Sequence, residues 1–585
     1  MSSSPVAVPS PETADTTMRY SFVLTDTQGT VGYVTCSPAS PISLDTAIAY
    51  LEKRPFDDFM HKHVLERLRE SGADTVTALL DTALDDTGII RPVLAALLLE
   101  TCLLSADCTA LLSRFPDHAA ERLAPHTPFI HLKWWLRDDR QAHAAWAKRF
   151  RANMHTHRLL PLPHDLEELD LPLLYPPQEA GETAISVSEV RPALAAEPHG
   201  PAWQRPAPEE TAMLALERLV EYGFVADVEM RHIASLSPIA LLRRWHLDIG
   251  VRCGRHDISL QGIATSYGRG LRLAAARAGY SMEMVERGSA FASVGPSAVL
   301  NTQEDTPITV ARLSELQARG ISAMDPNSIP LEVAYTDEPL HWMTGHTPGE
   351  AGPEPILVPV QLVFMFCNLD EIALFAAPGS TGLASGNIME EAKVAALTEI
   401  LERDAEATRP FLKRDCFLLS SEDPALRLLL EDYAARGVHV MFQDITTEFG
   451  IPCYKAFVMS AKGEVMRGTG AGLNGRRAVV SALTETPYPY PQGPASAPAL
   501  RNLPVRRHEE LPDYSMEDPI RDLTLLERTL IANNRRPIYV NIRRADLQFP
   551  VVKAFIPGLE LTADFDIYSR VSRRLFTNYL REYRE

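Results

Sequence analysis

The sequence predicts an α/β (α+β) fold with repeated strand–turn–helix units, preceded by a mainly α-helical N-terminal domain. Apolar residues recur at helical spacing in the first part of the chain, for example over Phe59–Leu68 and Val93–Leu104. From Glu209 onward, strand-like and helix-like segments alternate. Between these parts, residues 161–208 hold ten of the chain's 45 prolines, a composition that favours extended conformers.

These observations divide the chain into four segments. Residues 1–17 are rich in Ser, Pro and Thr and are predicted to be a disordered tail. Residues 18–160 form the predicted helical domain, which opens with a hairpin of Tyr20–Leu24 and Val31–Cys36. Residues 161–208 are the predicted Pro-rich linker. Residues 209–585 form a domain of catalytic size.

Within residues 209–585 the elements follow from apolar periodicity and from turn residues. Glu209–Tyr222 is a predicted helix. The predicted strands are Trp245–Leu260, Ile356–Cys367, Cys453–Met459, Pro537–Ile542 and Val551–Ile556.

Composition excludes several classes of function. The formal net charge of -19 argues against a broad nucleic-acid surface, because phosphate binding needs clustered Lys and Arg. The seven cysteines show neither Cys-x-x-Cys pairs nor zinc spacing, which is typical of a reduced compartment. The longest apolar stretch, Pro92–Leu99, is too short to span a membrane. We therefore expect a cytoplasmic protein with no nucleic-acid and no membrane partner.

A Glu-x-x-Glu-Arg box occurs twice, each time thirteen residues after a glycine turn. The copies are Gly270 with Glu283, Glu286 and Arg287, and Gly386 with Glu399, Glu402 and Arg403. On a helix, glutamates at i and i+3 project from one face, so each helix offers a carboxylate pair. Four carboxylates brought together must repel or hold cations, and hard oxygen ligands suit magnesium.

An alternative interpretation is that both boxes are ordinary solvated ion pairs on amphipathic helices. The repeated upstream spacing and the apolar flank of the second box, including Leu397 and Ile400, weigh against it. A carboxylate on a mostly buried helix needs a partner or a cation. A third, partial copy has Gly472 thirteen residues before Glu485. The repeat suggests related units whose helices converge on one cleft.

The segment Thr381–Asn387, followed by Glu390–Ala392 and Glu399–Asp404, closely resembles the signature of the YcaO family. Other landmarks of that family follow in its order within residues 209–585. They are Gly268–Gly270 with Glu283–Arg287, then Ala482–Glu485, Pro550–Val552 and Ile556–Glu560. Family members bind ATP with magnesium and activate a peptide-backbone amide. A nucleophile adds to the carbonyl and the oxygen leaves as phosphate, which yields azolines, amidines or, with a sulfur donor, thioamides.

The resemblance implies ATP and Mg2+ as cofactors and gives roles to seven residues, although it assigns no catalytic group. Glu283, Glu286, Glu399 and Glu402 would hold magnesium, whereas Asn387, Arg403 and Glu485 would contact the nucleotide. This agrees with the chemistry of the residues. Phosphorylation makes the amide oxygen a better leaving group, and metal-clamped phosphates supply the electrostatic stabilisation on which phosphoryl transfer depends.

Two positions depart from the family pattern. Gly279 stands where the family usually has Ser, and Ser481 where it usually has Arg, which removes a bidentate phosphate clamp. Arg476 and Arg477, about one helical turn away, are candidates to replace that clamp. No lysine around Pro206–Glu210 corresponds to the family's lysine near the start of the domain.

The predicted function is ATP/Mg-dependent activation of a backbone amide in a peptide or protein, for thioamidation or cyclodehydration. Family members that form azolines often end in a proline-rich tail. The end of this chain, Leu580–Glu585, differs from it, which favours a thioamide-forming enzyme or an accessory factor to a ribosomal-protein methylthiotransferase.

Expected partners are a peptide or protein substrate and a sulfur-transfer or methylthiotransferase protein, and a homodimer is a further candidate assembly. The alternative, motivated by Gly279 and Ser481, is a non-catalytic YcaO-fold scaffold that binds a peptide or a partner protein. The linker would let the N-terminal domain move and recognise the substrate. Deleting residues 1–170 is therefore predicted to leave ATP binding intact.

Overall fold

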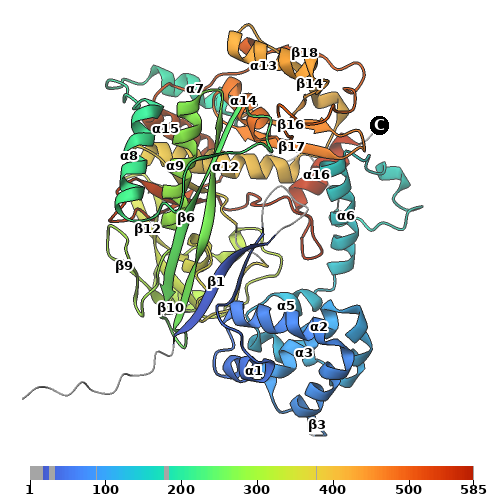
Figure 1. Ribbon diagram of the computed structural model, residues 1–585. Helices are drawn as coiled ribbons and strands as arrows, with labels where there is room; N and C mark the ends of the chain where they lie inside the picture. Colours follow the sequence, from blue (N-terminus) through green and yellow to red (C-terminus); the bar gives the residue numbers. More distant parts are fainter. Residues whose placement is uncertain (1–16, 26–32, 87, 177–183, 377–378, 584–585) are drawn as a thin grey trace, which may run out of the picture.

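A group of helices occupies one end of the molecule, and β-sheets covered by further helices occupy the rest (Figure 1). The computed structural model describes residues 17–25, 33–86, 88–176, 184–376 and 379–583. The N-terminal helices are α1 (Leu44–Lys53), α2 (Asp58–Ala83), α3 (Pro92–Leu104), α4 (Ala119–Leu123), α5 (His131–Trp135) and α6 (Arg140–Thr156). The predicted fold class is confirmed, with a mainly helical N-terminal region before mixed helices and sheets.

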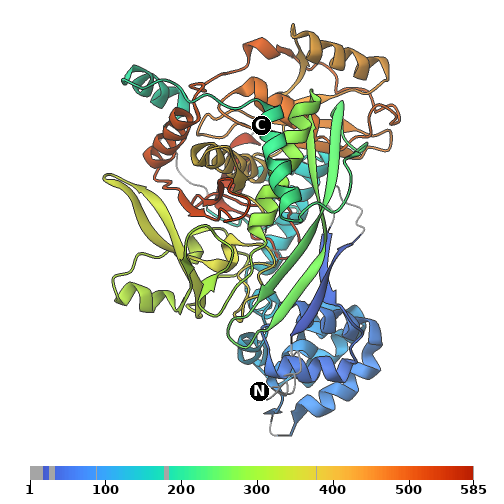
Figure 2. The same ribbon diagram turned by 60° about the vertical axis from the view of Figure 1, so that its left-hand side comes forward.

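The first sheet joins the beginning of the chain to its middle. Its order is β2 (Tyr33–Pro38), β1 (Met18–Thr25), β7 (Ile258–Gly270), β6 (Ile239–Val251) and β5 (Met230–Arg231). β1 and β2 pair antiparallel, as the predicted hairpin requires, and residues 26–32 between them lie outside the described residues. β1 also runs parallel to β7, with Tyr20 opposite Leu260. Figure 2 shows this hairpin beside the long β6–β7 pair.

Two further sheets carry the later predicted strands. One has the order β10 (Thr309–Ala311), β11 (Leu340–Gly349), β19 (Ile538–Asn541), β20 (Val551–Phe555) and β13 (Leu383–Ser385), with β12 (Gly352–Pro359) paired to β11. The other has the order β17 (Val465–Ala471), β16 (Cys453–Met459), β15 (Met441–Asp444), β14 (Cys416–Ser420) and β18 (Val505–Arg507). Two-stranded pairs are β3 (Leu84–Asp85) with β4 (Gly88–Ile89), and β8 (Ala298–Val299) with β9 (Thr306–Pro307).

The predicted strand Ile356–Cys367 is wrong in its second half. β12 ends at Pro359, and Val360–Val363 forms the short helix α11. Proline has no N–H with which to continue a ladder, so pairing with β11 stops there. The remaining helices are α7 (Val187–Ala196), α8 (Pro208–Glu221), α9 (Leu273–Ala290), α10 (Leu313–Ala318), α12 (Met389–Thr408), α13 (Pro424–Ala435), α14 (Gly475–Glu485), α15 (Pro519–Ala532) and α16 (Arg573–Glu582). Among the described helices, none is both long and apolar enough to cross a membrane.

Three strand–turn–helix units, β7–α9, β13–α12 and β17–α14, interlock, and we call them the three-unit ring. α9 packs on β7 and β13, α12 on β13 and β17, and α14 on β17 and β7. Glycines permit this close approach. A Cβ placed on Gly268 would lie 1.8 Å from the carbonyl oxygen of Ala276, and one on Gly470 would lie 2.3 Å from that of Ala478. Each helix therefore packs on the strand of its own unit and on the strand of another unit.

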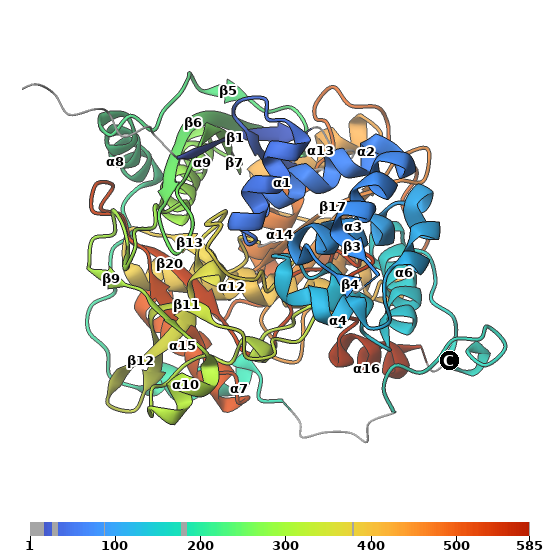
Figure 3. The ribbon, with the colours of Figure 1, turned by 90° about the horizontal axis from the view of Figure 1, so that it is seen from below.

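The N-terminal residues share their buried cores with the rest of the chain. Tyr20 and the apolar faces of α2 and α3 belong to the same core as Trp245 of β6. On another side, Trp146 of α6 packs edge-on against Phe576 of α16, with ring centroids 5.0 Å apart. Seen from below, α1–α4 lie in front of the sheets and α6 lies near α16 (Figure 3). Within the predicted linker, Val187 and Leu194 of α7 are buried in a core with α12 and α15.

Glu100, which closes the apolar run of α3, is fully buried. Its Oε2 lies 2.5 Å from His61 Nε2, and its Oε1 accepts a hydrogen bond of 2.8 Å from the Thr127 hydroxyl. Burial raises the pKa of this carboxyl, but His61 and His131 outweigh burial and lower the pKa to about 2. The carboxylate thus organises the centre of the N-terminal helices.

Replacing Glu100 by alanine is expected to lower the free energy of unfolding by about 3 kcal/mol, because it leaves the buried His61 without its acceptor and removes the carboxylate beside the half-buried His131. Since the folded pKa is below the ordinary value of 4.5, the stabilisation is present above pH 4.5 and is lost as pH falls towards 2. Urea unfolding at several pH values measures both effects. Glu121→Ala, which removes an exposed pair with His118, is the control. Equal stability of the two variants would contradict the prediction.

Candidate functional site

Five predicted glutamates meet inside the three-unit ring. Glu283 and Glu286 come from α9, Glu399 and Glu402 from α12, and Glu485 from the end of α14. Glu399 lies close enough to each of the other four for their charges to interact. The structure therefore brings the two boxes and the partial third copy to one place.

Backbone amides in the ring strands or directly before them hold three of these carboxylates. The amide of Tyr267 donates to Glu283 Oε2 at 2.7 Å, and that of Gly382 donates to Glu399 Oε2 at 3.0 Å. Glu402 Oε2 accepts from the amide of Ala471 at 3.1 Å, so this carboxylate is held by the strand of the next unit. Fixed backbone donors leave little rotamer freedom, which pre-organises the cluster.

Four cationic side chains face the five glutamates. Arg287 lies 3.4 Å from Glu286, and Arg403 lies 2.8 Å from Glu402 and also bonds Glu406. The charge of Arg269 acts on Glu485, and that of Lys553 acts on Glu286. Because Arg403 is shared with Glu406, negative charge remains in excess at the centre of the site.

Burial and mutual repulsion raise the pKa values of these carboxyls. Burial is the main cause for Glu283, Glu402 and Glu485, and it raises the pKa of Glu286 to about 8. Within the residues that the structure describes, no three or more His, Cys, Asp or Glu side chains are arranged to hold a metal ion by themselves. The cluster of half-buried carboxylates fits a hard divalent cation that takes its other ligands from phosphate and water.

Asn387 lies at the start of α12, roughly 18 Å along the helix from Glu399. Its backbone and side-chain amides donate to Glu391 Oε2 at 2.8 and 2.9 Å, and its Oδ1 accepts from the Thr211 hydroxyl at 3.0 Å. Arg205 pairs with the same Glu391. Arg205 therefore brings a positive charge close to Asn387. It directly precedes Pro206–Glu210, where the sequence has no counterpart of the family's lysine.

Two functional residues at the cluster were not predicted from the sequence. Glu406 accepts from the Thr469 hydroxyl at 2.8 Å; burial raises its pKa, but Arg403, Lys455 and Arg467 outweigh burial and lower it to about 2. It continues the helical spacing of the second box, which is the signal that could have identified it. Lys553 is buried and donates to the Thr381 carbonyl at 2.8 Å. The sequence feature that could have identified Lys553 is its position as the only charged residue of the apolar strand β20.

The structure does not favour Arg476 as the replacement for the missing clamp at Ser481. Arg476 instead pairs with Asp513 at 2.7 Å. The arginine that faces Glu485 is Arg269, from the glycine turn of the first unit. Its Nε is buried without a hydrogen-bond partner in the described part of the chain.

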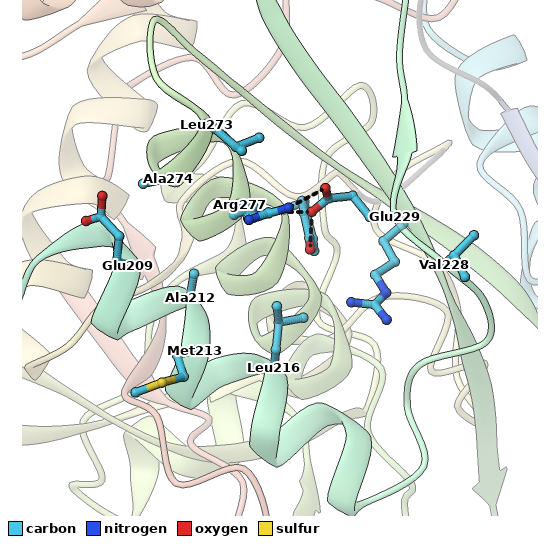
Figure 4. Close-up of a pocket in the computed structure, with 11 residues that line it drawn as sticks. Glu209, Ala212, Met213, Leu216, Val228, Glu229, Leu273, Ala274 and Arg277 are labelled. Carbon is cyan, nitrogen blue, oxygen red and sulfur yellow. Dashed lines mark hydrogen bonds and ion pairs between the residues drawn. The ribbon is translucent and has the colours of Figure 1, made fainter.

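A pocket of about 650 Å³ lies between α8, α9 and β6, and it contains none of the predicted site residues (Figure 4). Its polar wall is formed by Arg277, which donates to both oxygens of Glu229 at 2.9 and 3.0 Å. Apolar side chains, including Met213, Leu216 and Leu273, line the rest. The pocket lies outside the glutamate cluster.

Comparison with protein families gives one extended match. The family described as YcaO cyclodehydratase, ATP- and Mg2+-binding, matches residues 267–560, which is half of the chain and includes all seven predicted site residues. Two curated relatives are similar as well. An uncharacterized protein of Methanothermobacter thermautotrophicus is 29% identical over 408 residues, 63% of this chain and 97% of its own length. An uncharacterized protein in the tfuA 3' region of Rhizobium leguminosarum bv. trifolii is 26% identical over 242 residues, 38% of this chain and 54% of its own length.

Solved structures with partial similarity include a heterocyclase in complex with substrate and cofactor. It is 18% identical with a TM-score of 0.48, over 64% of this chain and 55% of the heterocyclase chain. The structure of YcaO from Methanopyrus kandleri bound with AMPPCP and Mg2+ is 20% identical with a TM-score of 0.43, over 60% of this chain and 91% of that one. This chain thus spans about half the length of the heterocyclase and nearly all of the shorter protein.

Proposed function

Because the chain belongs to the YcaO family, we propose that it is an ATP- and magnesium-dependent enzyme that activates a backbone amide of a peptide or protein. The observation that carries this proposal is the meeting of Glu283, Glu286, Glu399 and Glu402 beside Glu485. Their surplus charge suits a divalent cation, and nucleotide phosphates would complete the coordination of that cation.

Different residues of the cluster would bind the cation and the phosphate groups. The glutamates of α9 and α12 would hold the cation from two sides, kept in place by the strand amides. Arg403 and Arg269 would contact phosphate oxygens, because guanidinium groups bind them with several donors. Lys553 lies next to Glu399 and Glu286, where its ammonium would offset negative charge. Magnesium, when bound, would stabilise the charge that develops on the transferred phosphoryl group.

The proposed reaction removes the carbonyl oxygen of the amide. A nucleophile adds to the carbonyl carbon, and the oxygen takes the terminal phosphoryl group of ATP, which releases ADP. The carbon–oxygen bond then breaks and the oxygen leaves as inorganic phosphate. A neighbouring side chain as nucleophile gives cyclodehydration, and a sulfur donor gives thioamidation. In the second case, the protein would act as an accessory factor to a ribosomal-protein methylthiotransferase.

The direct test is calorimetric titration of the purified protein with ATP, with and without magnesium. We expect binding that depends on magnesium and is removed by a chelator. Mass spectrometry of a candidate peptide then separates the two products, because exchange of oxygen for sulfur raises the mass and loss of water lowers it. A folded protein that binds no ATP at millimolar concentration with magnesium would contradict the enzymatic proposal.

The second candidate, a scaffold with a degenerate nucleotide site, is favoured by Ser481. Gly279 is explained differently, because a Cβ there would lie 3.2 Å from the Cα of Gly268 and crowd the contact between α9 and β7. Ser481→Arg therefore separates the two candidates. A gain of about tenfold or more in ATP affinity would indicate a decayed site, whereas an unchanged affinity would indicate that Arg269 already supplies the contact.

A further inference from the structure

A second polar cluster lies beyond Glu406, the carboxylate that Arg403 joins to Glu402. It consists of Gln443 on β15, Lys455 on β16, Arg467 and Thr469 on β17, and His157 after α6, and we call it the Lys455 cluster. In the strand register, Lys455 lies opposite Gln443 of β15 on one side and opposite Thr469 of β17 on the other. Arg467 lies two residues before Thr469 on β17. These four side chains therefore share one face of the sheet. The hydrogen bond from Thr469 to Glu406 shows that this face is turned towards α12.

Polar groups of the Lys455 cluster are buried without partners. Lys455 is 1% exposed and makes neither a hydrogen bond nor an ion pair with any described residue. The fully buried Gln443 donates to the Pro410 carbonyl at 3.0 Å, but its Oε1 has no partner in the described part of the chain. Both ring nitrogens of His157 are likewise unpartnered there, although the ring stacks on Phe411 at 3.7 Å. Natural proteins leave few buried polar atoms unsatisfied, so several in one cluster indicate a ligand.

Positive charge is in excess in the Lys455 cluster. Lys455, Arg467 and Arg403 all act on Glu406, and the charge of Asp564 acts on Arg467 as well. Arg467 has neither a hydrogen bond nor an ion pair with the residues that the structure describes. Burial, with the charges of Lys455 and Arg467, lowers the pKa of His157 to about 3, so the imidazole stays neutral. A neutral ligand would leave two cations unpaired, whereas an anion would pair them.

We propose that the Lys455 cluster is an anion subsite beside the nucleotide site, which holds a small oxyanion between Lys455 and Arg467. An oxyanion supplies acceptors for the ammonium, the guanidinium and a ring N–H of His157, whereas the Gln443 oxygen is itself an acceptor and is not paired by such an ion. Arg467 is partly exposed and gives the ion access from solvent. Only the source of the oxyanion rests on the proposed function. It is either the phosphate released by amide activation or a carboxylate of the peptide substrate.

Calorimetry and thermal unfolding of the full-length protein in EDTA, with inorganic phosphate or acetate as the probe, test this subsite without magnesium. We expect phosphate to bind and to raise the melting temperature. Lys455→Met should weaken that binding by about tenfold or more. Lys462→Met, in the exposed turn between β16 and β17, is the matched control and should bind as the wild type does. If acetate binds as well as phosphate, the natural ligand is a carboxylate of the peptide substrate. If only phosphate binds, the natural ligand is the phosphate released by amide activation.

A further readout separates a ligand-binding lysine from a structural one. Without added anions, Lys455→Met should melt close to the wild-type temperature, because removing the cost of burying the ammonium offsets the lost attraction between Lys455 and Glu406. A clear loss of melting temperature, or unchanged phosphate binding in Lys455→Met, would overturn the proposal. Arg467→Gln, at a partly exposed position, gives a second variant if the first does not fold. Magnesium-dependent ATP binding is measured on the same proteins. If the protein binds ATP but not phosphate, the subsite is refuted and the proposed function stands. If it binds phosphate but not ATP, the proposed function is refuted and the subsite stands.

Discussion

Replacement of Glu399 and Glu402 together by glutamine is expected to lower the magnesium-dependent affinity for ATP by at least about 100-fold. Glutamine keeps the shape of each side chain and can still accept from the amides of Gly382 and Ala471. It removes the two negative charges by which α12 would hold the cation. Calorimetric titration with ATP and magnesium measures the loss, and the two single variants show how the charges share it.

The same substitution should have the opposite effect on the protein without ligands. Glu402 is half-buried beside Glu399, Glu406 and Glu485, so that removing charge relieves repulsion. We expect the double variant to melt above the wild type in EDTA. Glu431→Gln, at an exposed site on α13, is the control and should change neither property. Wild-type ATP affinity in a folded double variant would contradict the assignment of these two residues to the metal.

Deletion of residues 1–170 is expected to abolish cooperative folding, and with it ATP binding. The sequence predicts the reverse, but β1 pairs along β7, the strand of the first ring unit. The deletion also removes Trp146 and Phe150, which cover the aromatic face of α16. Exposure of that much apolar surface outweighs the few kcal/mol by which domains are stable. Circular dichroism during thermal unfolding, together with sedimentation, measures the outcome.

Two neighbouring leucines after α6 provide a gentler test of the same contact. Leu160 is 5% exposed in the core with α16, whereas Leu159 is 82% exposed. Leu160→Ala should lower the free energy of unfolding by about 3 kcal/mol, and Leu159→Ala should leave it nearly unchanged. Urea unfolding compares the pair. A truncated protein that folds and binds ATP would instead support a separable N-terminal domain, as the sequence predicts.

The glutamate cluster could be predicted because its signals are local. Carboxylates at i and i+3, repeated after the same glycine spacing, indicate both the helix face and the relation between units. The partners of these carboxylates could not be predicted in that way. Arg269 and Lys553 come from strands far apart in the sequence. The residues next to Arg269 and Lys553 in the sequence do not indicate that either side chain faces a glutamate. Their positions depend on how each helix packs against strands of other units.

The organisation of the N-terminal part shows a similar limit. Alternation predicted the β1–β2 hairpin, because turn and period lie within a few residues. The parallel pairing of β1 with β7 joins residues about 240 positions apart, and local patterning does not encode such a pairing. Proline content predicted a linker over residues 161–208. Composition alone misses α7, whose Val187 and Leu194 are buried against elements from the other half of the chain.

Interlocking of the three-unit ring has a consequence for synthesis of the protein. The carboxylates of α9 leave the ribosome well before those of α12, and α14 must follow before it can pack on β7. Lys553 emerges later still, on β20. A nascent chain that stops before α14 therefore carries four of the five glutamates of the cluster without Glu485. Glu402 gains its backbone donor only once β17 has been made, and Glu286 and Glu399 gain the charge of Lys553 only with β20.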